Sequence, residues 1–116
     1  MAAISLDNVA ENALILRCVI HTGLFELVAS ENNENILIKP RNSKRCYTIR
    51  DFMKESAFYH GMKDGLKGNG FNNPYDHNDN LFPRIKAREY NLGYLKGKKY
   101  AGQFQLGMQS MKRKWN

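Results

Sequence analysis

Residues that could act in catalysis or bind a metal are few and scattered along the sequence. His21, His60 and His77 each lack a cysteine or carboxylate at the spacing of metal ligands. Cys46 follows two basic residues, which favour its thiolate, but no partner base is identifiable around it. The acids of DHND at 76–79 lack the spacing and the closing Glu of a calcium loop. We therefore expect no catalytic residue, no metal site, no cofactor and no enzymatic activity.

Basic residues that could bind phosphates concentrate near the C-terminus. From Arg84 onward nine basic residues stand against one acid, Glu89, a net charge of +8, whereas residues 1–51 hold six basic and six acidic residues and are neutral. Such a local excess is the electrostatic footprint expected of a nucleic-acid-binding segment. The candidate nucleic-acid-binding residues are Arg84, Lys86, Arg88, Lys96, Lys98, Lys99, Lys112, Arg113 and Lys114.

Aromatic residues alternate with these cations. Tyr90, Tyr94 and Tyr100 lie among the basic residues, a mixture found where proteins grip phosphates and stack on exposed bases. The alternative is that these tyrosines belong to the core while the lysines solvate the outer surface, and we favour a core position. The cations stay available for binding in both cases.

Length and composition limit the class of protein. A chain of 116 residues with 42% hydrophobic and 25% charged residues fits one compact domain, or a small domain with an arm. Two distant cysteines with no signal peptide before them predict reduced thiols and a cytoplasmic location. The longest apolar run, at 13–20, contains Arg17 and is too short for a membrane span. We expect a monomer or homodimer without a membrane partner.

The first half of the sequence predicts a helix followed by a β-hairpin. Apolar residues keep helical spacing over residues 6–20, although residues 14–20 also fit a strand. Gly23 suits the end of the helix. The apolar segments LFELVAS and NILIKP flank the polar ENNE at 31–34, which is the pattern of a hairpin. The following segment, RNSKRCY, fits either a basic loop or a third short strand.

Two longer helices are predicted in the second half. Thr48 resembles the first residue of a capping box and opens one helical segment that ends at Gly68. A loop rich in Asn, Asp and Gly then leads to Pro83, which suits the first turn of a helix reaching about residue 99. Residues 102–116 either continue this helix past a glycine or form a tail that frays into solvent.

Four glycines stand at matched positions in these two helices. FYHGMKDG at 58–65 and YNLGYLKG at 90–97 each place two glycines four residues apart, on one helix face. Because a glycine inside a helix costs about 0.8 to 1 kcal/mol relative to alanine, the pairs indicate a close approach of another group. We favour a crossing of the two helices through these faces; the alternative is that Gly61 or Gly65 ends the first helix. The glycines concerned are Gly61, Gly65, Gly93 and Gly97.

The same segments resemble the ribosome modulation factor family. FYHGMKDGLKG, a loop with NPY at 73–75 and AREYNLGYLKG follow one another within residues 57–101. This order is similar to the family's two helices with aromatic-x-x-Gly repeats around a Pro-Tyr loop. The resemblance implies a small basic protein that binds ribosomal RNA near the site of messenger docking and silences ribosomes in slow growth. It also implies that the four glycines are packing residues and that Pro74 and Tyr75 shape the loop.

These observations predict an α+β fold in three parts. Residues 1–50 would form an N-terminal helix and β-hairpin, residues 51–101 a helix pair packed through Gly-x-x-x-Gly faces, and residues 102–116 a basic tail. We expect RNA binding, with ribosomal RNA as the first candidate, and modulation of ribosome or translation activity. The alternative is a phage-type, anti-CRISPR-like inhibitor that binds a host or defence complex of protein and nucleic acid through its basic surface. A DNA-binding regulator is disfavoured because the loop at 68–83 is too long for a helix-turn-helix.

Overall fold

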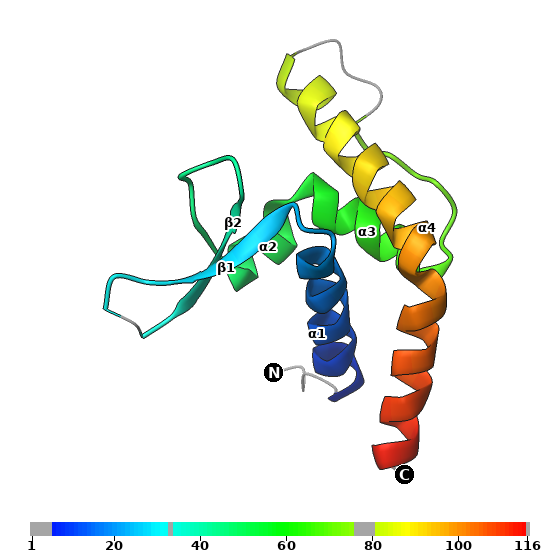
Figure 1. The fold of residues 1–116 in the computed structure, drawn as a ribbon. Helices are drawn as coiled ribbons and strands as arrows, with labels where there is room; N and C mark the ends of the chain where they lie inside the picture. The colour runs from blue at the N-terminus through cyan, green and yellow to red at the C-terminus, as the bar shows by residue number, and fades with distance from the viewer. Residues whose placement is uncertain (1–5, 33, 76–80, 116) are drawn as a thin grey trace, which may run out of the picture.

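The structure, a computed structural model, describes residues 6–32, 34–75 and 81–115 (Figure 1). Within these ranges it is α+β, as predicted, with four helices and a three-stranded antiparallel sheet. None of these helices combines the length and apolar content that crossing a bilayer requires. The elements in chain order are α1 (Leu6–His21), β1 (Phe25–Ala29), β2 (Ile36–Pro40), β3 (Tyr47–Thr48), α2 (Ile49–Glu55), α3 (Ala57–Lys67) and α4 (Leu81–Trp115).

α1 covers the segment for which a strand was the alternative. Its inward face carries Leu14, Ile15 and Val19, which are all buried, and their spacing of one and four residues is helical. Gly23 follows the helix with a φ of 78°, in the left-handed region that glycine adopts without a steric penalty. The chain can therefore turn directly from α1 into β1.

The sheet contains the predicted hairpin. β1 and β2 pair antiparallel with Leu27 opposite Ile38, and Pro40 ends β2. Ile38 is completely buried, so the hairpin attaches to the core through the middle of β2. The segment after Pro40 combines both alternatives: it begins as a loop, and Tyr47 and Thr48 then pair with β2 as the short strand β3.

The prediction of a single helix between Thr48 and Gly68 is wrong, because the helix is interrupted at Ser56 and forms α2 and α3. Thr48 does cap α2, its hydroxyl accepting a hydrogen bond from the Asp51 N–H at 3.0 Å. Ser56 is extended, with ψ of 117°, and its hydroxyl accepts from the Tyr59 N–H at 3.1 Å, so it serves as the N-cap of α3. Gly68 ends α3, as predicted, and it adopts the left-handed conformation.

α4 is longer than the predicted second helix. It starts before Pro83 and runs without interruption through Gly102 to Trp115. Of the two alternatives for residues 102–116, the structure therefore has the continued helix. Phe104 explains the continuation, since it is only 4% exposed and packs in the core. Burial of one phenylalanine side chain stabilises by about 1.5 to 3 kcal/mol, more than the roughly 1 kcal/mol that a helical glycine costs.

The two halves of α4 have different neighbours (Figure 1). α3 packs across its first half and α1 lies beside its second half. The core joins these helices to β2 and α2 through buried apolar side chains. The fully or almost fully buried members of this core include Ile15, Val19, Ile38, Phe52, Phe58, Tyr59, Met62, Leu66 and Phe104.

Candidate nucleic-acid interface

At four glycines of α3 and α4, an added Cβ atom would meet main-chain atoms of the other helix. A Cβ atom added at Gly61 would lie 2.9 Å from the Tyr94 backbone nitrogen, and one at Gly65 would lie 2.8 Å from the Lys98 nitrogen. From the other helix, a Cβ at Gly93 would lie 3.0 Å from the Met62 nitrogen. The nearest obstacles are main-chain atoms, which cannot rotate aside as a side chain can. A side chain at any of these positions therefore requires the helices to separate.

The two helices run in the same direction where they touch. Gly61 lies against Tyr90 and Tyr94, and Gly65, one turn later, lies against Tyr94 and Lys98, so positions advance together along both helices. Because both helices run in the same direction, the chain must pass from the end of α3 back toward its start before α4 can begin. With a rise of 1.5 Å per residue, the 11-residue α3 is about 16 Å long. The parallel arrangement thus accounts for the long connection between α3 and α4.

Tyr90 links α4 to α3 and to the connection between them through hydrogen bonds. The ring is 1% exposed, its hydroxyl donates a short hydrogen bond to Asp64 Oδ2, and the Asn72 N–H donates to the Tyr90 oxygen at 3.3 Å. Burial, supported by the Asp64 contact, raises the pKa of Tyr90 to about 12. Tyr90 is therefore a neutral core residue at physiological pH and presents no ring face to a base.

The loop is anchored mainly by a residue that the sequence reasoning missed. Asn73 is 6% exposed; its amide donates to the Ala87 carbonyl at 3.0 Å and to Asn91 Oδ1 at 2.9 Å. Its side-chain oxygen accepts from the Tyr75 N–H at 2.9 Å, which is an Asx turn. Pro74 is exposed and Tyr75 half-buried. The tendency of Asn to bond the backbone two residues on was the available clue to this anchor.

The other two tyrosines of α4 are half-buried. Tyr94 packs edge-on against Phe71, with ring centroids 5.2 Å apart, and donates its hydroxyl to the Asn69 carbonyl at 3.3 Å. Tyr100 packs against His21 at 6.2 Å. The predicted core position is correct for Tyr90, whereas Tyr94 and Tyr100 lie between core and surface.

The structure brings together some of the candidate basic residues and separates others. Arg84, Arg88 and Lys99 are exposed, and at 100° per residue they lie within roughly 60° on the side of α4 away from α3. Lys98 is exposed about 40° from Arg84 at the edge of this side, whereas Lys86 is exposed on the opposite side of the helix. Lys96 is half-buried. Lys112, Arg113 and Lys114 lie in the last part of α4, and their side chains fall outside the described part of the structure.

Three of these lysines lie over tyrosine rings. The Lys86 ammonium is 5.7 Å from the ring centroid of Tyr75, and that of Lys98 is 5.5 Å from the ring of Tyr94. Lys99 lies 5.7 Å from its neighbour Tyr100. Cation–π contacts of this kind contribute about 0.5 to 1 kcal/mol at exposed sites, so they bias the lysines toward defined positions without removing their charge.

Leucines interrupt the outward basic surface, a feature that the sequence reasoning also missed. Leu92, Leu95 and Leu106 are 42%, 65% and 68% exposed, and helical spacing places them on the same side of α4 as Arg88 and Lys99. The outward surface of α4 is therefore both basic and apolar. The three leucines are spaced by three and eleven residues, which places them on a different helix face from Gly93 and Gly97. This spacing was visible in the sequence.

Residues with catalytic or metal-binding potential are not gathered into one site in the described ranges. No group of three His, Cys, Asp or Glu side chains there could hold a metal ion. Cys18 and Cys46 are free thiols, and burial raises the pKa of Cys18. His60 makes a 3.0 Å hydrogen bond to the Met53 carbonyl. The DHND segment lies outside the described residues.

No protein-family model matches the chain, and neither the curated proteins nor the solved structures contain a significant match to it.

Proposed function

We propose that α3 and α4 pack through their Gly-x-x-x-Gly faces to form a fixed platform, and that the basic residues of α4 bind RNA from this platform. The observation that carries the proposal is the set of exposed cations on a helix whose backbone is held against a second helix. Arg84, Arg88 and Lys99 face outward together, Lys98 lies at the edge of the same side, and Lys86 adds an exposed charge on another side of α4.

The physical argument rests on phosphate neutralisation. RNA phosphates release condensed counterions when lysine and arginine replace them, which supplies most of the affinity of sequence-independent binding. Cations on one helix that is already packed lose little backbone entropy on binding, so more of this electrostatic gain appears as affinity. The resemblance to the ribosome modulation factor family favours ribosomal RNA as the target and modulation of ribosome activity as the outcome.

The test is a salt titration of affinity for structured RNA. Engagement of about six phosphates predicts a slope of log affinity against log salt of roughly −4 to −5. The variant R84Q/R88Q/K99Q should lower affinity and reduce the slope by about 2 to 3. R41Q/K44Q/R50Q removes three exposed cations outside α4 and is the matched control. Equal losses in both variants, or a response independent of salt, would contradict binding through α4.

Sedimentation identifies the target more directly. A tagged protein applied to a ribosome gradient should travel with ribosomal particles, and the R84Q/R88Q/K99Q variant should remain near the top. The control variant should sediment like the unaltered protein. If the unaltered protein stays at the top while it still binds isolated RNA, the ribosomal assignment fails and RNA binding remains.

The exposed leucines favour a second candidate function, inhibition of a protein complex. Leu95 and Leu106 would add apolar burial at a partner surface that also carries acidic groups for Arg88 and Lys99. Capture from lysate with and without nuclease distinguishes the candidates, since a protein target should be retained after nuclease treatment. L95S/L106S should then abolish capture of the protein and leave RNA affinity nearly unchanged.

A further inference from the structure

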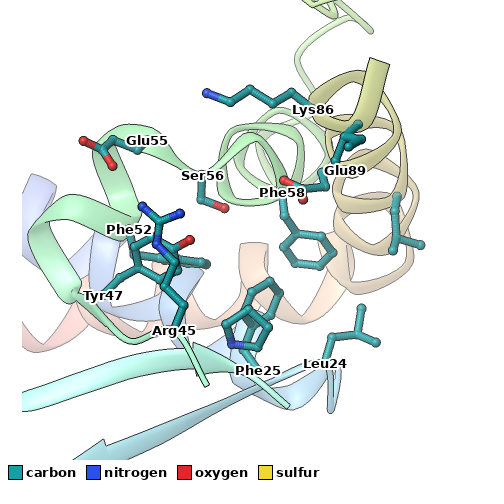
Figure 2. Close-up of a pocket in the computed structure, with 13 residues that line it drawn as sticks. Leu24, Phe25, Arg45, Tyr47, Phe52, Glu55, Ser56, Phe58, Lys86 and Glu89 are labelled. Carbon is teal, nitrogen blue, oxygen red and sulfur yellow. The ribbon is translucent and has the colours of Figure 1, made fainter. Parts of the chain in front are cut away.

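A cleft separates the sheet from the first half of α4 (Figure 2). Among the described elements α4 packs on α3 and α1, and no strand Cα comes within 8 Å of a Cα of α4. The space between them has a volume of about 530 Å³, which lies within the usual range of ligand-binding sites. Its walls come from β1, β2, the loop before β3, the α2–α3 junction and α4. The cleft is therefore built by five parts of the chain.

The interior of the cleft is apolar and aromatic. Figure 2 shows the rings of Phe25 and Phe58 side by side at its base, and their centroids are 5.0 Å apart. Leu24, Ile85 and Leu92 also line it, and they are 39%, 45% and 42% exposed. Large apolar side chains that remain this exposed around one cavity favour an occupant with apolar faces, because its binding would remove them from water.

Four charged groups surround these apolar walls. Arg45 and Lys86 are positive, Glu55 and Glu89 are negative, and all four line the cleft. Figure 2 shows Arg45 on one side, Lys86 extending from α4 on the other, and Glu89 beside Phe58. Within the described ranges the ion pairs are Lys39–Glu26 and Lys67–Glu11, so these four groups form no ion pair with one another. Arg45 lies 5.1 Å from the ring centroid of Tyr47 and Lys86 lies over Tyr75, contacts that hold these cations without neutralising their charge.

Glu89 is the acidic group of the cleft that α4 contributes. Although its side chain keeps contact with solvent, desolvation by the cleft walls raises the pKa of its carboxyl, while nearby Lys86 acts in the opposite direction. A ligand N–H directed at this carboxylate would replace the lost water. An occupant with a flat apolar body and hydrogen-bond donors on one edge therefore suits the cleft.

We propose that this cleft binds one unpaired guanine base of the RNA that α4 engages, an inference that rests on the proposed function. Guanine presents two acceptors, O6 and N7, on one edge, which suit Arg or Lys. Its N1–H and N2 amino group are neighbouring donors that suit a carboxylate. Adenine has no such donor pair, and pyrimidines offer less surface to the phenylalanine rings. The two cations and two carboxylates of the cleft thus suit the polar edges of guanine, and the phenylalanine rings suit its flat faces.

The position of the cleft agrees with RNA as the source of the base. Ile85, Glu89 and Leu92 belong to the same turns of α4 as Arg84 and Arg88. A strand whose phosphates contact these arginines can turn one base into the cleft, since sequence-specific RNA recognition usually targets bases free of a duplex. Phosphate contacts would supply the affinity and the cleft would supply the base preference.

The experiment measures affinities for four labelled, U-rich RNA heptamers that carry G, A, C or U at the centre. We expect the G-containing strand to bind about tenfold or more tightly, the discrimination of one bidentate base contact. E89Q and E55Q should reduce this preference without changing the salt slope, and I85W should remove it by filling the cleft. E34Q, at an exposed acid of the hairpin turn, and L106W, on α4 away from the cleft, are the matched controls.

The outcomes separate this inference from the proposed function. Salt-dependent binding of all four strands with equal affinity would overturn guanine recognition and leave RNA binding intact. Absence of binding to every RNA would overturn the proposed function and the RNA-bound guanine with it. A separate arm with guanosine monophosphate distinguishes the source: resonance shifts at Phe25 and Leu92, lost in I85W, together with equal affinity for the four heptamers, would overturn the RNA-bound guanine and assign the cleft to a free nucleotide. Capture of a protein that I85W abolishes and the nucleotide does not displace would overturn the guanine assignment.

Discussion

Replacing Gly97 by alanine tests whether the glycine contact holds the helix pair together. The new Cβ would lie 2.9 Å from the Leu66 nitrogen and 3.0 Å from the Gly65 Cα, and closer still to the Met62 carbonyl oxygen. Ordinary van der Waals contact begins near 3.4 Å, and the contact with the Met62 oxygen falls short of this by about 1 Å, so α3 and α4 must separate by about that much. Because all three obstacles are main-chain atoms, the whole contact has to open.

The expected free-energy change is a balance of two effects. Overpacking against a structure that cannot relax locally costs about 1 to 3 kcal/mol, and a backbone obstacle places G97A near the upper value. Alanine gains about 1 kcal/mol of helix propensity over glycine. G97A should therefore lower the free energy of unfolding by about 2 kcal/mol, which corresponds to a fall in Tm of about 8 °C in a chain of this size.

Gly102 provides the matched control on the same helix. It is exposed, and a Cβ added there would meet nothing within 4 Å. G102A should keep the propensity gain and raise the free energy of unfolding by up to about 1 kcal/mol. Denaturant unfolding followed by circular dichroism measures both variants, which should differ by about 3 kcal/mol. If G97A is as stable as G102A, the close approach of the two backbones is not what holds α3 against α4.

Three further predictions concern the polar contacts and pH. Y90F should lower the free energy of unfolding by about 1 to 2 kcal/mol in denaturant titration, because Asp64 loses the phenol donor; Y75F, which leaves this contact intact, is the control. N73A should destabilise by about 2 to 3 kcal/mol and speed amide exchange in the loop, and unchanged exchange would contradict the anchor role. Burial raises the pKa of Tyr59 and Tyr90 from 10.0 to about 12, so both bind protons more tightly when folded. Their stabilisation is complete below about pH 10 and lost as pH rises through 12, which unfolding titrations should show with a smaller loss in Y90F.

Local patterns in the sequence predicted those parts of the fold that depend on neighbouring residues. The hairpin, the Thr48 cap and the Gly68 stop were all visible because each depends on a few adjacent residues. The break at Ser56 was missed since serine is tolerated inside helices, and the choice between continuing and capping depends on how α2 and α3 pack. The length of α4 was missed because burial of Phe104 against distant helices outweighs the local preference of Gly102.

The candidate site was predictable to a smaller extent. Basic residues can be found in any sequence, but their sides on α4 follow from which face α3 covers. Helical spacing puts Arg88 and Lys99 on one side, but that this side faces away from α3 follows from the positions of Gly93 and Gly97. The cleft could not be predicted, since its walls come from parts of the chain that no local pattern relates.

The glycine contact and the cleft depend on one geometric quantity, the distance between α3 and the first half of α4. Gly93 lies against the backbone of Phe58, and the side chain of Phe58 forms the base of the cleft. Because Glu89 and Leu92 precede Gly93 by one turn or less, a separation of the helices at Gly93 would move these walls of the cleft away from Phe58. A larger residue at this crossing would therefore disturb the cleft even though it makes no contact with an occupant. The close approach of Gly93 to the Phe58 backbone therefore sets how far this part of α4 stands from the base of the cleft.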